Sequence, residues 1–155
     1  MKEHFTVTPI GRVVSTRSYA NDDDWDAETT WIELDSTVVA PTAAVGLDSF
    51  SHIEVIYLFD RVTEEMIETG SRRPRGNPDW PDVGILAQRG RMRPNRLGAT
   101  ICQLESLDGA RISVRGLDAI DGTPVLDIKP VMSGFLPRTT VTQPDWADEI
   151  MREYW

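Results

Sequence analysis

Short apolar runs, separated by turn-forming residues, dominate the sequence. Asp108-Gly109 lies between the runs 99–104 and 110–115, and Asp121-Gly122 precedes a run at 124–128. An Asp-Gly pair in this setting is a strong hairpin signal, because both residues tolerate the positive φ angles of a tight turn. Further strands are predicted at 5–14, 31–35, 53–59 and 84–87, and a terminal helix at 145–152. This pattern predicts an all-β fold with minor α content, a small antiparallel β-barrel that is closed or nearly closed.

The run 53–59 is apolar at almost every position, so it is predicted to be buried on both faces. His52 precedes this run, and an isolated histidine in that place is interpreted as a hydrogen-bonded core residue or, second, as a site residue at the strand mouth. The single cysteine, Cys102, lies in an alternating run and is also predicted to be core. No disulfide framework is therefore expected.

Length and motif content limit the organisation and the chemistry. A chain of 155 residues has the size of one domain, so a single domain over 1–155 is expected. No stretch is long and apolar enough for a membrane span, and the N-terminus lacks a signal-peptide core, which predicts a soluble cytoplasmic protein. Paired Cys or His at metal spacing, a Walker loop and a Gly-x-Gly-x-x-Gly turn are absent. We therefore expect no metal site.

A cluster of arginines stands out against the charge of the whole chain, which is -9 with a pI near 4.6. It holds four cations within eight residues: Arg89, Arg91, Arg93 and Arg96. An acidic run, 118–130, follows about twenty residues later. A cationic loop and an acidic run in one domain suit a zwitterionic ligand. The acidic pI argues against general nucleic-acid binding but leaves a local basic contact with RNA open, since seven of the 16 Lys and Arg lie between 72 and 96.

Five fragments in order resemble the TsaA-like family, also called TrmO: Thr8–Gly11, Asp48–Ile53, Gly84–Arg89, Arg93–Gly98 and Asp121–Pro130. The resemblance implies an S-adenosylmethionine-dependent methyltransferase with a small β-barrel instead of a Rossmann fold. The implied activity is N6-methylation of a threonylcarbamoylated adenosine beside the tRNA anticodon. The implied assembly is a homodimer whose cofactor pocket lies near the subunit interface.

Under this resemblance the cofactor pocket lies between the arginine cluster and the acidic run. Arginines suit the cofactor carboxylate. The carboxylates of Asp118, Asp121 or Asp127 suit its ribose hydroxyls or ammonium, while Asn95 and the backbone of 126–129 suit its adenine. The cofactor-binding residues are expected to be Arg89, Arg93, Asn95, Asp121, Thr123, Asp127, Ile128 and Lys129.

Methyl transfer is an in-line displacement, so positioning supplies most of the catalysis. An exocyclic adenine nitrogen is a poor nucleophile and gains from a group that accepts its proton. His52 and Asp127 are the candidates for that catalytic role.

Departures from the family pattern leave the methyl acceptor open. The family commonly reads Arg-Pro-Asn-Pro, whereas here Arg96 follows Asn95; two small hydroxyls next to Arg89 are also missing, and Val131 replaces a tyrosine. Longer family members carry a C-terminal domain, and the 155 residues are expected to hold the β-barrel domain without it. Besides the tRNA adenosine, the acceptor can be a small heteroaromatic or amine metabolite in a pocket lined by some of Trp25, Trp31, Tyr57 and Trp80. A non-catalytic S-adenosylmethionine-binding module is the third hypothesis.

Substrate contacts are assigned to the residues that depart from the family motif or lie in an irregular loop: Arg91, Arg96 and Trp80. The loop 70–81 has neither helical nor strand periodicity. A connection of this length commonly binds something or is disordered, which makes it a candidate lid.

Overall fold

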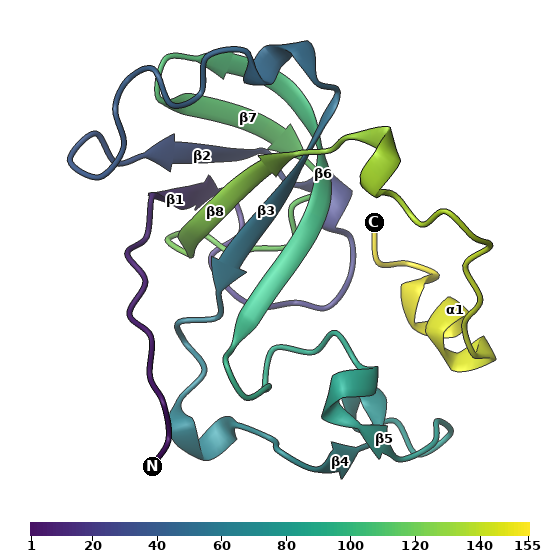
Figure 1. Cartoon of the computed structure of the whole chain (residues 1–155). Coiled ribbons are helices and arrows are strands. Elements are labelled where there is room, and N and C mark those ends of the chain that lie inside the picture. The colour runs from purple at the N-terminus through teal and green to yellow at the C-terminus, as the bar shows by residue number, and fades with distance from the viewer.

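The computed structural model describes all residues, 1–155, and is built around a closed antiparallel barrel with the strand order β1-β2-β7-β6-β3-β8 (Figure 1). The barrel strands are β1 (Gly11–Ser15), β2 (Thr30–Leu34), β3 (His52–Leu58), β6 (Leu97–Asp108), β7 (Arg111–Arg115) and β8 (Pro124–Pro130). A separate pair consists of β4 (Ser71–Arg72) and β5 (Val83–Gly84). The predicted all-β barrel is confirmed.

Helical structure is confined to the connections and the C-terminal part. The α-helix α1 (Asp145–Met151) confirms the predicted terminal helix. Single 3-10 turns occur at Trp25–Ala27, Leu47–Ser49, Glu64–Met66, Pro74–Gly76, Ile85–Ala87 and Ser133–Phe135. The strand predicted at 84–87 is therefore wrong beyond Gly84: Ile85 is buried by a helical turn instead of by a continued strand.

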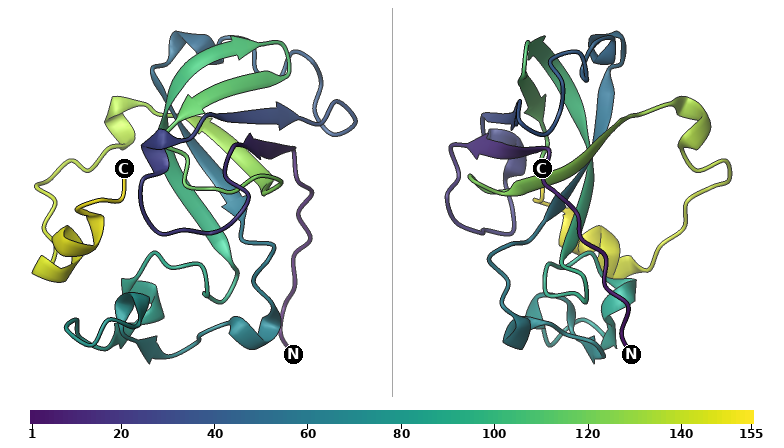
Figure 2. Two further views of the ribbon diagram at one scale, coloured as in Figure 1. Left: turned by 180° about the vertical axis from the view of Figure 1, so that it is seen from behind. Right: turned by 60° about the vertical axis from the view of Figure 1, so that its left-hand side comes forward.

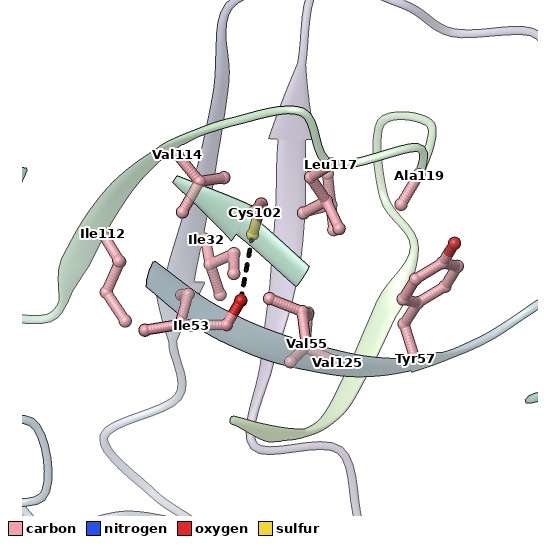
Figure 3. Close-up of a cluster of buried hydrophobic side chains, with 11 residues drawn as sticks. Ile32, Ile53, Val55, Tyr57, Cys102, Ile112, Val114, Leu117, Ala119 and Val125 are labelled. Carbon is pink, nitrogen blue, oxygen red and sulfur yellow. Dashed lines mark hydrogen bonds between the residues drawn. The ribbon is translucent and has the colours of Figure 1, made fainter. Parts of the chain in front are cut away.

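Alternation along each strand fills the barrel interior (Figure 3). In β3 the side chains of Ile53, Val55 and Tyr57 point inward and are at most 1% exposed, whereas the intervening residues are only partly buried. The prediction that this run is buried on both faces was wrong, because its outer side carries no covering layer. Cys102 is core, as predicted, and its thiol donates to the carbonyl of Ile53 at 3.7 Å. Burial, and then the charge of Asp118, raises the pKa of this thiol to about 12.

The two Asp-Gly turns have different roles. Asp108 pairs with Arg111 across a tight β6–β7 hairpin, in which Gly109 has a φ of 58°. Asp121-Gly122 makes no hairpin, because β8 pairs with β1 and β3 and not with β7. Its carboxylate accepts from the amide of Ser15 at 3.1 Å, and the Gly122 amide donates to the carbonyl of Val13 at 2.8 Å. The second turn therefore attaches the chain to β1, which closes the barrel.

A carboxylate closes one end of the barrel. Asp118, in the connection between β7 and β8, accepts hydrogen bonds from the hydroxyls of Tyr57, Thr100 and Tyr154. Tyr154 comes from the C-terminal segment, which runs outside the barrel on the β6 side (Figures 1 and 2). The carbonyl of Tyr154 also accepts from the amide of Trp25 at 3.0 Å. Asp118 thus joins the core to the C-terminal segment.

Candidate functional site

The outward side of β8 carries an ion pair. Val125 points into the core, and an irregularity in the β3–β8 register between Val125 and Asp127 places Asp127 beside Ile56, with Lys129 beside Glu54, on the outside of the barrel. The Lys129 Nζ lies 2.8 Å from an oxygen of Asp127, and the two side chains are 59% and 47% exposed. The hydrogen bond and the charge of Asp127 raise the pKa of Lys129. We call the outward side of β8, β3 and β6 the outer face.

The outer face has an apolar floor beside this ion pair. Ile56 separates Asp127 from Ala99 on β6, and Ile101 follows on the same side with 48% of its surface exposed. Arg89 donates a hydrogen bond to the carbonyl of Ala99. Two strand spacings, roughly 10 Å, separate Ala99 from Asp127, so the Arg89 guanidinium lies at the β6 edge of the floor, on the opposite side from the ion pair. The floor and these charges form one surface.

The other residues in and beside the arginine cluster fall into two groups, side chains that hydrogen-bond to the backbone and side chains that are exposed. Arg93 donates to the carbonyl of Gln88 at 2.7 Å, and Arg96 donates to that of Val62 at 2.6 Å. Arg91 and Asn95 are exposed and make no side-chain hydrogen bond. Arg96 has a φ of 53°, which a proline cannot adopt, so the departure from the family pattern accompanies a left-handed backbone here. Two of the predicted ligand-binding arginines therefore shape the loop.

Three predicted cofactor residues lie apart from the outer face. Asp121 is bound to the backbone of Ser15, and the buried Thr123 donates its hydroxyl to the carbonyl of Ile120 at 2.7 Å. Ile128 packs against the core. Asp121 and Thr123 belong to the turn before β8, and Ile128 is turned inward by strand alternation, which leaves Asp127 and Lys129 as the outward members of the predicted residues in 121–129.

The prediction of His52 as a core residue was wrong, because its side chain is exposed at the start of β3. The hydroxyl of Ser51 and the Nδ1 of His52 are 2.7 Å apart. The register continues from His52 to Gln103 on β6 and on to Arg115 on β7. Sequence reasoning missed Gln103, Arg115 and also Glu54; the signal that could have found them is their alternation with buried residues.

The aromatic residues proposed for a metabolite pocket face different parts of the molecule. Trp25 and Tyr57 are buried, and Trp31 lies on the outside of β2 with the guanidinium of Arg111 4.7 Å above its ring. Trp80 donates from its indole to Glu149 at 2.6 Å, which ties the loop 70–81 to α1. The structure does not bring these four rings together.

Two general findings concern the whole chain. None of its helices has both the length and the apolar character needed to cross a membrane. No group of three or more His, Cys, Asp and Glu side chains is arranged to hold a metal ion.

The match to a family model decides the relationship. The model described as the tRNA-methyltransferase O N-terminal domain matches residues 21–135. The chain belongs to this family. It is 34% identical over 124 residues to a putative S-adenosylmethionine-dependent methyltransferase, RcsF, from Pseudomonas aeruginosa. This alignment covers 72% of the chain and 50% of the relative. It is 34% identical over 100 residues to the human tRNA (adenine(37)-N6)-methyltransferase, covering 64% of the chain and 22% of that enzyme.

Two further similarities agree with this family assignment. A probable S-adenosyl-L-methionine-binding protein from Methanothermobacter thermautotrophicus is 41% identical over 92 residues, which covers 57% of the chain and 60% of that protein. The crystal structure of TrmO from Pseudomonas aeruginosa has a TM-score of 0.73 and 26% identity over 94% of the chain and 64% of that structure. The chain thus spans about half the length of the Pseudomonas relative, RcsF.

Proposed function

We propose that this chain is an S-adenosylmethionine-dependent N-methyltransferase that acts on N6 of a threonylcarbamoylated adenosine beside the tRNA anticodon. The observation that carries the proposal is the outer face, where the Asp127–Lys129 ion pair and Arg89 flank an apolar floor. The names of the Pseudomonas and human relatives support the reaction and the acceptor.

The groups on the outer face suit the parts of S-adenosylmethionine. The carboxylates of Asp127 and Glu54 accept from ribose hydroxyls or an ammonium, and the cations of Arg89 and Lys129 attract the carboxylate. Ile56, Ala99 and Ile101 offer apolar surface to the adenine ring. When bound, the cofactor supplies a methyl group activated by its sulfonium. Fixing that group beside a nucleophile is the main task of the protein.

His52 is the better candidate for the proton acceptor. It lies on the same side of β3 as Glu54, two residues away, or roughly 7 Å along the strand. In the tautomer whose Nδ1–H donates to the Ser51 hydroxyl, Nε2 is unprotonated and can accept a substrate proton. Asp127 is already paired with Lys129, so accepting a proton there would break that ion pair.

A homodimer is part of this proposal. Apolar side chains remain exposed on and beside the outer face: Leu97 44%, Ile101 48%, Met132 47%, Phe135 88% and Leu136 43%. Exposed apolar groups that cluster in this way are typical of protein interfaces. A second copy packed here would lie next to the cofactor surface. Light scattering tests this assembly, and a monomer at micromolar concentration would contradict it.

A binding module without turnover is the second candidate, favoured by the archaeal relative that is named as a binding protein. One experiment separates the possibilities. The purified protein is incubated with S-adenosylmethionine and either total tRNA or a metabolite pool, and S-adenosylhomocysteine is measured by mass spectrometry. Product with tRNA supports the proposed enzyme, and product with metabolites alone moves the acceptor to a small molecule. Cofactor binding without any product supports the binding module.

Salt dependence gives an independent check of the acceptor. Binding of tRNA to a protein with a local cationic loop should weaken steeply as salt rises, because phosphate contacts release counterions. Binding of a neutral metabolite should change little over the same range.

A further inference from the structure

A cleft of about 360 Å³ lies next to the outer face, where β7 leaves β6. β7 pairs with β6 only from Gln103 onward, so the edge of β6 from Leu97 to Cys102 has no strand beside it on that side. The cleft is lined by Asp26, His52, Ile101, Cys102, Gln103, Arg115, Gly116 and Trp155. Its size falls within the range of small-molecule sites.

The polar groups of the cleft include donors and acceptors in balance. Arg115 offers a guanidinium, Asp26 a carboxylate and Gln103 an amide that both donates and accepts. One positive and one negative charge do not favour a phosphate. A neutral ring with hydrogen-bonding edges fits this set better.

The aromatic wall of the cleft is Trp155, of which 46% is exposed. Its ring lies over the backbone of Gly116, since a Cβ at that glycine would lie 3.8 Å from the indole. The ring of Tyr154 packs edge-on against the indole, with 4.8 Å between the ring centroids. Tyr154 is itself held by two hydrogen bonds, from its hydroxyl to Asp118 and from the amide of Trp25 to its carbonyl. A ring held in this way is a preformed platform, and base stacking on such rings is largely independent of sequence.

We propose that this cleft binds the methyl acceptor as a flat 6-aminopurine base stacked on Trp155, with Gln103 and Asp26 hydrogen-bonded to its edge. This inference rests on the proposed function. His52 lines the cleft and adjoins Glu54 of the outer face, so an exocyclic amine in the cleft meets the methyl donor beside His52.

The reaction at this junction balances. The amine nitrogen forms a bond to the methyl carbon while the carbon–sulfur bond of the donor breaks, and its electron pair stays on sulfur. The proton lost from the amine passes to Nε2 of His52 and then to water.

The test compares Trp155→Ala and Trp155→Phe with Trp31→Phe, a matched change on β2 at a tryptophan that does not line the cleft. Adenosine and an anticodon stem-loop are titrated separately, and each variant's melting temperature and S-adenosylmethionine affinity are recorded. Trp155→Ala should weaken binding of the adenine base tenfold or more, and Trp155→Phe should restore most of it. Trp31→Phe should change nothing.

If free adenosine binds, the cleft recognises the base itself. If the stem-loop binds and free adenosine does not, the cleft recognises the base only as part of an RNA. As a second measurement, the indole NMR signal that Trp155→Phe removes should shift when either ligand is added. Unchanged binding in a folded Trp155→Ala protein, or an unshifted signal, overturns the inference. If S-adenosylmethionine fails to bind while adenosine still shifts that signal, the proposed function fails and the base site stands.

Discussion

Asp118 and Asp127 are nine residues apart in the sequence but have opposite environments. Asp118 faces the end of the barrel and accepts from three hydroxyls. Asp127 faces outward and is 47% exposed, with Lys129 as its ion-pair partner. The first carboxylate is saturated by the fold, whereas the second keeps acceptor capacity for a ligand. The contrast predicts that changes around Asp118 alter stability and that changes at Asp127 alter binding.

The largest effect is expected from Gly98→Ala. A Cβ at this position would lie 2.3 Å from the ring of Tyr57, so the ring must shift and its hydrogen bond to Asp118 is disturbed. Overpacking together with a disturbed hydrogen bond should cost roughly 3 to 4 kcal/mol of unfolding free energy. Urea denaturation measures this. Gly84→Ala is the control, since nothing lies within 4 Å of its added methyl group. Equal stability of the two variants would contradict the close packing.

Asp118→Ala comes next. It leaves the buried hydroxyl of Tyr57 and that of Thr100 without their carboxylate, which should cost roughly 2 to 3 kcal/mol, or about 5 to 10 °C in melting temperature. Asp118→Asn keeps one acceptor oxygen and should be intermediate. A melting temperature unchanged in Asp118→Ala would show that this carboxylate does not hold the barrel end together.

Alkaline pH tests the same region without mutation. Burial and the charge of Asp118 raise the pKa of Tyr57, Tyr154 and Cys102, the last from 9.0 to about 12. A folded-state pKa above the unfolded value gives stability that is complete below the unfolded pKa and is lost as pH rises. Unfolding free energy should therefore fall between pH 9 and 11, by roughly 2 kcal/mol from the thiol alone and by more when the two tyrosines also ionise on unfolding.

A matched variant and a thiol probe check the contribution of Cys102. Cys102→Val should show a smaller alkaline loss than the wild type, because the buried thiol no longer ionises on unfolding. At pH 8 a thiol-specific reagent should label Cys102 only slowly in the folded protein and rapidly in urea. Fast labelling of the folded state would contradict the burial of this thiol.

The sequence could predict the barrel, the core position of Cys102 and the first Asp-Gly hairpin, because alternation and turn chemistry act locally. It could not predict that the second Asp-Gly turn attaches to β1, since that depends on the distant amide of Ser15. His52 was misplaced because an apolar run such as 53–59 does not reveal which face lies inward. The position of Trp155 carried no local signal at all, because it depends on Tyr154 reaching Asp118.

Asp127→Asn should reverse the pattern predicted for Asp118, because it should change binding and not stability. The loss of one carboxylate charge on the outer face should weaken S-adenosylmethionine binding about tenfold, while the melting temperature stays within about 1 °C because exposed ion pairs contribute little. Glu33→Gln is the control, since it breaks a comparable exposed pair with Arg111 at 3.6 Å, away from the outer face. Calorimetry measures the affinities. An unchanged affinity in Asp127→Asn would remove this residue from the cofactor site.

The smallest effect on the cofactor is expected from Arg91→Ala, and it extends the comparison to the arginines. Arg91 makes no side-chain hydrogen bond, so its loss should change S-adenosylmethionine affinity less than about twofold while lowering tRNA affinity and the steepness of its salt dependence by about one counterion. Arg93→Ala removes a donor to the backbone of Gln88. It should loosen the loop and lower the affinity for S-adenosylmethionine severalfold. If both variants lowered the affinity for S-adenosylmethionine equally, Arg91 would contact the cofactor directly, and tRNA recognition would have to come from another surface.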